Sequence, residues 1–327
     1  MTSADVARAA GLSRATVSYV LNDTPHQKIP EETRRRVLAA AARLEYAPSA
    51  AARALRSGRS DVVLCLLPDW PVGPEVGALL GHLSTELARR GWTLAVHPTT
   101  GGDRPIAQLW RAITPAAVLA FEELSDDDIS AMRAAGVAVV VALLGRSSRR
   151  PRELEVPQQR VGRLQAQHLA ATGHSRLGYA YPDDPRLAGF ARPRLEGVAA
   201  ACTELGLDPP AVQTVPLEAD AAAVAIQLWR GNTPAVTGVC AYNDDVALAV
   251  LAGLRLLGLE APTDLAVVGV DDIAAARLAA PPLTTVTTDQ SAVARQLTDT
   301  IIAAIADESP PSRPGAEVAR LVRRAST

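Results

Sequence analysis

The chain has little cysteine. Its three cysteines, Cys65, Cys202 and Cys240, lie far apart and show neither a CxxC pattern nor a Cys/His ligand spacing. An odd number of isolated cysteines argues against a disulfide framework, and the missing spacing argues against a zinc site. We therefore expect three small, buried thiols, no metal ion and no cofactor.

Long apolar runs and aromatic residues are also scarce. No stretch of about 18 uninterrupted apolar residues occurs, and the N-terminal residues do not form a basic segment followed by an apolar run. These two absences predict a cytoplasmic protein that does not enter a membrane. Aromatic residues make up only 3% of the chain, so few side chains are left to stack on a sugar ring.

Recognisable catalytic motifs are missing. The five histidines have neither a metal-ligand spacing nor a neighbouring nucleophile motif, and Gly101-Gly102-Asp103 is not a phosphate-binding glycine pattern. The acidic run Asp126-Asp127-Asp128 stands at the start of a predicted helix, where carboxylates favour the helix dipole. The sequence predicts no catalytic residue, and an enzyme is a hypothesis without a motif.

What the chain does have is an uneven distribution of charge. Residues 1–60 hold ten Lys and Arg against five Asp and Glu, whereas residues 61–327 hold 23 against 30. The net charge of -2 thus combines a head of +5 with a body of -7. A basic head on an acidic body fits a polyanion-binding module joined to a different domain, although a basic helix face is more often simply solvated.

The basic head has the pattern of three short helices. Thr2 and Asp5 have capping-box spacing, Gly11 predicts the end of the first helix, and Ser13 predicts the cap of a second. A third helix is predicted from Pro30. The expected core is shared by the three helices: Val6, Ala10, Val17, Val20, Leu21, Val37, Leu38 and Leu44. Two short helices joined by a tight glycine turn form a helix-turn-helix.

The second helix carries residue types that read DNA. Its N-terminal and outward positions are small or polar, and we expect them to contact DNA: Ser13, Arg14, Ala15, Thr16, Ser18, Tyr19 and Asn22. Arg14 is placed to donate two hydrogen bonds to a guanine, whereas Thr16, Ser18 and Asn22 suit phosphates. The alternative is an ordinary three-helix bundle that does not bind DNA.

A connector follows the head. Ser49–Arg56 is an alanine-rich helical pattern with Leu55, and Ser57-Gly58-Arg59-Ser60 is a flexible link. A helix this short is marginal by itself, so we expect it to need a partner to fold.

From Asp61 onward, apolar runs of strand length alternate with helical patterns. The runs expected to be strands are Val62–Leu67, Leu94–Val96, Ala117–Ala120, Val137–Ala142, Leu177–Tyr181, Val236–Cys240 and Leu265–Val270. Such alternation predicts parallel, doubly wound sheets, and the strands are too many for one comfortable sheet. The expected fold is a small all-α helix-turn-helix head followed by an α/β core of two doubly wound parallel-sheet lobes.

The segment Asp5–Asn22 resembles the signature of the LacI/GalR family of bacterial repressors, with Leu12 in place of one valine. Further family motifs follow in order at Thr33–Val37, Leu44–Pro48, His168-Leu169, Gly173-His174, Arg194–Gly197, Ala241–Asp244, Val268–Asp272 and Pro281–Val286. Because the resemblance covers essentially the whole chain, the protein is identified as a member of this family.

Membership implies a repressor that binds a palindromic operator as a homodimer, with higher oligomers left open. It also implies that the helix after the head is a hinge helix that folds on the operator and opens the minor groove with Leu55. The alternative for Leu55 is a linker residue that packs on its own domain. The implied domains are a head over residues 1–48, a hinge helix and linker over 49–60, and a periplasmic-binding-protein-like core over 61–327. Within the core, the first lobe takes about 61–156 plus 289–315, and the second about 157–288 plus 316–327.

The family further implies a small-molecule effector in the cleft between the lobes. Arg194, Asn243 and Asp271 match positions that hydrogen-bond the effector, and Asp69 and Phe190 are added as polar and aromatic candidates. Asn243 and Asp271 also stand at strand-to-helix turns, where such residues commonly cap helices. Because the family's Asp-Asn pair ahead of the cleft helix is replaced by two glutamines, the effector is expected to be sugar-like or an atypical metabolite, and its existence stays open.

A competing hypothesis is a small-molecule-binding or transport protein with a degenerate head. The intact helix-turn-helix pattern and the missing export signal oppose it. Sequence-preferring binding to an operator palindrome separates the two.

Overall fold

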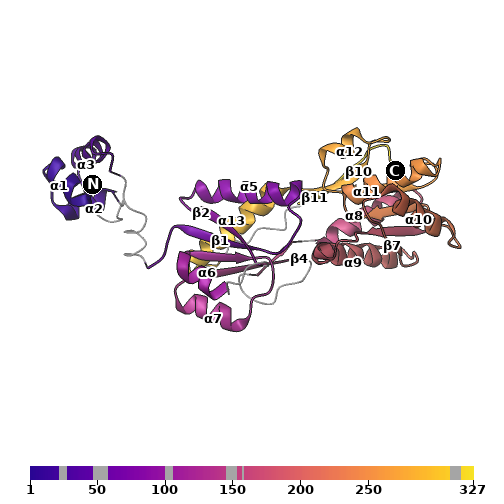
Figure 1. Cartoon of the computed structure of the whole chain (residues 1–327), viewed down its shortest axis with the longest axis horizontal. Coiled ribbons are helices and arrows are strands. Elements are labelled where there is room, and N and C mark those ends of the chain that lie inside the picture. The colour runs from indigo at the N-terminus through magenta and orange to yellow at the C-terminus, as the bar shows by residue number, and fades with distance from the viewer. Residues whose placement is uncertain (22–27, 47–57, 100–105, 145–152, 157, 310–317) are drawn as a thin grey trace.

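The computed structural model describes the chain except for residues 22–27, 47–57, 100–105, 145–152, 157 and 310–317. A small helical head comes first in the chain, and two α/β lobes follow it (Figure 1). The fold class expected from the sequence is the one observed.

The head is closed by a few specific contacts. Its helices are α1 (Ser3–Ala10), α2 (Arg14–Leu21) and α3 (Glu31–Arg43). Thr2 and Asp5 form the predicted capping box of α1, and Gly11 ends it with a φ of 65°, a conformation that glycine adopts without strain. The Arg36 guanidinium donates to the carbonyl oxygen of Ala10 at 2.7 Å, which fastens α3 to the end of α1.

Seven of the eight predicted core residues of the head lie in its core or pack against it. Its buried side chains are Val6, Ala7, Ala10, Val17, Val20, Val37, Ala40 and Ala41, and Leu21 and Leu44 are partly buried against them. The expectation that Leu38 is a core residue is wrong, because its side chain is 50% exposed. Positions 37, 40, 41 and 44 share one face of α3 at helical period, and Leu38 falls outside that face.

The first lobe contains a five-stranded parallel sheet in the order β2-β1-β3-β4-β5. Its strands are β1 (Val62–Leu67), β2 (Thr93–Pro98), β3 (Ala117–Ala120), β4 (Ala138–Leu144) and β5 (Glu153–Val156). One face is covered by α5 (Pro74–Ala88) and α13 (Gln290–Ala306), the other by α6 (Ile106–Ile113) and α7 (Asp126–Ala134). Central strands covered on both faces are apolar throughout, which explains why their sequences lack alternation.

The second lobe contains a six-stranded sheet in the order β11-β10-β9-β8-β6-β7, in which β11 pairs antiparallel with β10. Its strands are β6 (Leu177–Tyr181), β7 (Ala211–Thr214), β8 (Gly238–Ala241), β9 (Ala266–Val270), β10 (Thr284–Thr288) and β11 (Ala319–Val322). Its helices are α8 (Gln158–Ala171), η1 (Pro185–Leu187), α9 (Ala188–Glu204), α10 (Ala219–Arg230), α11 (Asp244–Leu256) and α12 (Ala274–Leu278).

Helices α8 and α9 touch through two glycines. A Cβ on Gly162 would lie 1.9 Å from the carbonyl oxygen of Arg194, and one on Gly197 would lie 1.9 Å from that of Gln159. Only glycine allows this approach. The contact holds α9, and with it Arg194, in place.

The two lobes exchange chain segments beside their cleft. Helix α13 follows β10 of the second lobe but buries Val293, Leu297 and Ile301 in the core of the first. Strand β11 then pairs with β10 in the second sheet. Gln290, the first residue of α13, therefore stands where the chain passes from one lobe to the other.

Candidate functional site

Helix α2 presents one face to solvent. Val17 and Val20 are buried in the core of the head, so the other side of the helix carries Arg14, Ala15 and Tyr19, all exposed. An exposed, narrow helix face with small and polar side chains has the shape that enters a major groove.

Two other predicted DNA contacts are engaged within the head. The backbone N–H of Thr16 donates to Ser13 Oγ at 3.1 Å, and the two hydroxyl oxygens lie 2.9 Å apart. Ser13 thus caps α2, as the sequence predicts. Ser18 is half-buried. Asn22 and Leu55 lie outside the described residues.

A cavity of about 490 Å³ lies between the two lobes. Its walls come from segments that follow the carboxyl ends of parallel strands: Trp70 after β1, Phe121 after β3, Tyr242 after β8 and Asp271 after β9. Such strand ends are where open α/β sheets bind ligands. The volume is within the range of small-molecule sites.

Arg194 is the best-anchored charge in this cavity. It is 7% exposed, its Nε donates to Gln158 Oε1 at 2.8 Å, and its Nη1 donates to the carbonyl oxygen of Tyr242 at 2.7 Å. Its Nη2 lies 3.8 Å from Asp271 Oδ1. A buried guanidinium needs such partners, because an uncompensated buried charge is strongly destabilising. Arg194 is therefore held in one orientation, with its charge already balanced by Asp271.

Asp271 reaches the cavity from a strained turn. Asp271 and Asp272 have φ values of 108° and 53°, which non-glycine residues rarely adopt. Asp272 accepts from Arg277 at 3.2 Å and also pairs with Arg324, so the turn is fixed from outside. Loss of hydration raises the pKa of Asp271, and the positive charge of Arg194 opposes that rise.

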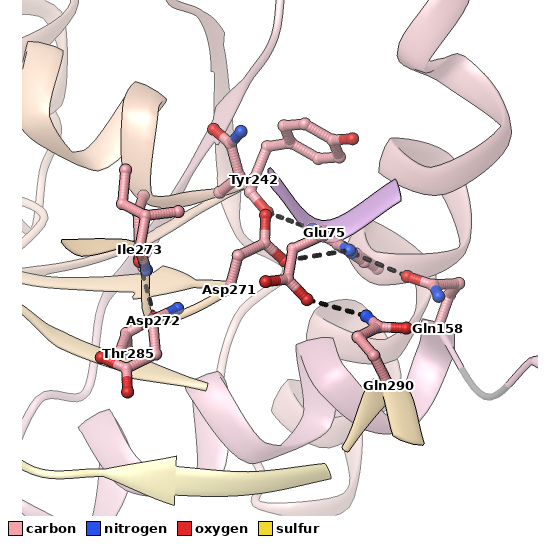
Figure 2. Close-up of polar contacts among 12 residues, drawn as sticks. Glu75, Gln158, Tyr242, Asp271, Asp272, Ile273, Thr285 and Gln290 are labelled. Carbon is pink, nitrogen blue, oxygen red and sulfur yellow. Dashed lines mark hydrogen bonds and ion pairs between the residues drawn. The ribbon is translucent and has the colours of Figure 1, made fainter. Parts of the chain in front are cut away.

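Glu75 is a cavity residue that the sequence interpretation missed. It lies in the first turn of α5, and its Oε2 accepts from Gln290 Nε2 at 2.7 Å. Figure 2 shows its carboxylate beside Asp271, although the two come from different lobes. Burial, with a further contribution from Asp271, raises the pKa of Glu75. An acid after a proline at a helix start is common, so no local pattern marks Glu75 as a binding residue.

Four of the eleven aromatic residues of the chain line this cavity. Trp70, Phe121, Phe190 and Tyr242 line the cavity, and Trp70 lies 5.3 Å from Phe121 between ring centroids. Trp229, by contrast, is fully buried in the second lobe, where its Nε1 donates to the Ala211 carbonyl oxygen at 2.8 Å.

The structure brings four of the five predicted effector residues to the cavity: Phe190, Arg194, Asn243 and Asp271. Asn243 also caps α11, since its Oδ1 accepts from the backbone N–H of Val246 at 3.0 Å. Asp69 is not among the lining residues; it is 62% exposed and lies 3.9 Å from Arg186. Its neighbour Trp70 faces the cavity instead.

Asp244 has a structural position beneath the site. It is fully buried; its Oδ1 accepts from the Thr285 hydroxyl at 2.7 Å and its Oδ2 from the Ile273 N–H at 2.9 Å (Figure 2 shows the loop and strand that it joins). Burial raises the pKa of Asp244 to about 7. The carboxyl group links α11 to β10 and to the turn that carries Asp271.

The described residues offer neither a metal site nor a membrane-spanning helix. Among them, no group of His, Cys, Asp and Glu is arranged to hold a metal ion. No described helix combines the length and apolarity that crossing a membrane requires. The three cysteines are buried and free, as expected, and burial raises the pKa of Cys65 to about 12.

A helix-turn-helix head joined to a two-lobed core with an interlobe cavity defines a ligand-responsive DNA-binding regulator. Comparison with known proteins agrees. Residues 2–49 match the model described as "Bacterial regulatory proteins, lacI family", and residues 166–327 match "Periplasmic binding protein-like domain". The chain is 30% identical over 320 residues to the transcriptional regulator GalR of Escherichia coli, an alignment covering 94% of this chain and 90% of that protein. This chain belongs to the LacI family.

Solved structures share the fold. The lac repressor dimer bound to operator and the anti-inducer ONPF superposes with a TM-score of 0.77 at 23% identity, covering 100% of this chain and 98% of that one. The transcriptional regulator CelR in complex with cellobiose gives a TM-score of 0.64 at 26% identity, with 100% of each chain covered.

Proposed function

We propose that this chain is a transcriptional repressor that binds a palindromic operator as a homodimer and changes its affinity when a small molecule fills the interlobe cavity. The observation that carries the proposal is the exposed face of α2, with Arg14 and Tyr19 outward, in a chain of the LacI family. Neither a transporter nor an enzyme needs such a helix face.

The proposed DNA contacts divide by chemistry. Arg14 stands exposed at the start of α2, so it is the candidate for a bidentate contact to guanine. Ser13 and Thr16 bond each other, which leaves their remaining capacity for phosphate oxygens. Ala15, Ser18 and Tyr19 complete the helix face, and Asn22 and Leu55 remain predictions from the sequence.

A homodimer follows from the proposed mode of reading. One α2 helix covers only a few base pairs, and a two-fold pair on a palindrome doubles the base contacts. The lac repressor, which shares this fold, was solved as an operator-bound dimer. We place the head at residues 1–48, the hinge and linker at 49–60 and the two-lobed core at 61–327, and we propose that the protein works in the cytoplasm without catalysing a reaction.

The proposed effector contacts are Phe190, Arg194, Asn243 and Asp271, to which the structure adds Glu75. They come from both lobes. A bound molecule would therefore favour one relative placement of the lobes, which is how a ligand shifts an equilibrium between two states.

Selection of DNA from a random pool with the full chain tests the proposal. We expect enrichment of a palindrome, two subunits per site, and affinity that falls steeply with salt. Enrichment of no sequence at any salt concentration would overturn it.

A further inference from the structure

The charged residues among the described lining of the interlobe cavity are mostly acidic. Arg194 is the one basic residue among them. Against it stand the carboxylates of Glu75, Asp183, Asp184, Glu218, Asp245 and Asp271. The whole chain is almost neutral, so this excess is local.

The guanidinium of Arg194 already has partners for its charge and for its N–H groups. Arg194 is balanced by Asp271 at 3.8 Å and donates to Gln158 and to the Tyr242 carbonyl oxygen. Of the other carboxylates, Asp184 is paired with Arg186 at 2.7 Å. Four acidic side chains therefore have no Lys or Arg partner within ion-pair distance among the described residues.

Glu75 is the most enclosed of these four. Its hydrogen-bond partner in the described structure is the neutral amide of Gln290; among charged groups, Asp271 and Asp272 raise the pKa of Glu75 and Arg194, which is already paired with Asp271, lowers it. A half-buried carboxylate facing another acid favours a positive charge between them. An anionic ligand would meet the opposite, since like charges in a confined site repel.

The aromatic walls point in the same direction. Trp70 of the first lobe meets Phe190 of the second at 4.6 Å between ring centroids, and Phe121 and Tyr242 stand beside them. Both phenylalanines of the chain are in this wall. The faces of such rings attract cations, especially those of tryptophan. A neutral sugar could stack on the rings but would leave the half-buried carboxylate of Glu75 without a cation, whereas Asp183, Glu218 and Asp245 are exposed to solvent.

We propose that the effector of this protein is an organic ammonium compound whose cationic nitrogen lies between Glu75 and the aromatic wall. The inference rests on the proposed function, because it takes the interlobe cavity as the effector site. The body of the ligand packs on Trp70 and Phe190, and Arg194 and Asn243 are left to orient its polar groups.

Pairs of compounds of similar shape, one cationic and one neutral, test the inference. The melting temperature of the full chain is measured with choline against 3,3-dimethylbutan-1-ol, and with glucosamine against glucose, at equal ionic strength set with sodium chloride. In at least one pair we expect the cation to raise the melting temperature by about 2 °C more than its neutral partner. Equal or larger shifts from the neutral partner in both pairs would overturn the inference.

Two variants test whether Glu75 is the carboxylate that binds the cationic nitrogen of the ligand. Glu75→Gln keeps the hydrogen-bonding shape but removes the carboxylate, and we expect it to abolish the difference within the pair. Glu308→Gln, an exposed position outside the cavity, makes the same chemical change and should leave the difference intact. A full difference retained in Glu75→Gln would contradict the placement, and intact operator binding shows that the variant is folded.

The operator assay separates this inference from the proposed function. If operator affinity responds to glucose but not to either cation, the regulator stands and the ammonium class is wrong. If the cation binds without altering operator affinity, the site stands and the proposed coupling fails.

Discussion

The rings of Trp70 and Phe190 meet edge to face across the interlobe cavity, with centroids 4.6 Å apart. One follows β1 of the first lobe and the other lies on α9 of the second. The contact therefore reports how the two lobes are placed, and a ligand must pack beside it or separate it.

Replacing Phe190 with Leu tests the aromatic wall. Loss of the ring removes an edge-to-face pair and a face for the ligand, so we expect ligand affinity to fall by about tenfold, or about 1.4 kcal/mol. Operator affinity without ligand is measured as well, because loss of the contact with Trp70 can also shift the placement of the lobes. Calorimetric titration measures the first quantity and a gel shift the second; unaltered ligand affinity would exclude Phe190 from the site.

Replacing Arg14 with Ala tests the reading of DNA. We expect loss of preference at one base pair in each half-site, worth about 1 to 3 kcal/mol, with non-specific binding nearly intact. Arg133→Ala, which removes an exposed arginine from α7 of the core, is the matched control and should have no effect. Uniform weakening on all sequences would instead make Arg14 a phosphate contact.

Replacing Arg194 with Ala should do two things at once. It removes a proposed ligand contact, so any ligand-induced change in operator affinity should disappear. It also leaves Asp271 without its cation, and we expect a loss of about 3 kcal/mol in the free energy of unfolding near pH 7. Because an unpaired Asp271 keeps its proton to higher pH, that loss should shrink as pH falls, as urea unfolding at several pH values will show. A loss that is constant with pH would contradict the pairing with Asp271.

The raised pKa of Asp244 predicts that the free energy of unfolding depends on pH. Its pKa rises from 3.8 to about 7 on folding, so its contribution is complete below pH 3.8 and is lost as pH rises through about 7. An asparagine can accept from the Ile273 N–H and donate to the Thr285 hydroxyl oxygen without ionising. We compare the free energy of unfolding of Asp244→Asn with that of the native chain at each pH. We expect the difference to be about 2 kcal/mol more in favour of the variant at about pH 8 than at about pH 5. Equal stability differences at the two pH values would show that Asp244 does not titrate in this range.

Much of the architecture could be predicted because its signals are local. Capping by Thr2, Asp5 and Ser13 and the turn at Gly11 depend on neighbouring residues alone. The buried strands with continuous apolar sequences, such as β1 and β3, were also found. Strands β7 and β10 were not, because AVQT and TTVTT are short and partly polar. Their identity depends on the sheet they join, which no local pattern reveals.

The residues of the site likewise divide into those that local sequence patterns predict and those that they do not. Arg194, Asn243 and Asp271, which line the cavity, could be proposed from the sequence because they lie in motifs that resemble those of a known family. Glu75 was missed because its meaning depends on the opposite lobe, 196 positions away at Asp271. Asp69 was predicted since a polar residue at a strand end is the usual binding group, but the direction in which the turn after β1 faces, which brings Trp70 to the cavity, cannot be derived from its sequence.

Reciprocal coupling between the head and the cavity is the most direct test of a ligand-controlled regulator. The dissociation constant of the selected operator is measured with and without saturating ligand, and that of the ligand is measured with and without saturating operator. We predict that both constants change by the same factor, because coupling between two sites of one molecule is reciprocal. Two sites that bind their partners with unchanged constants would contradict the account, since the cavity would then not control the DNA-binding head.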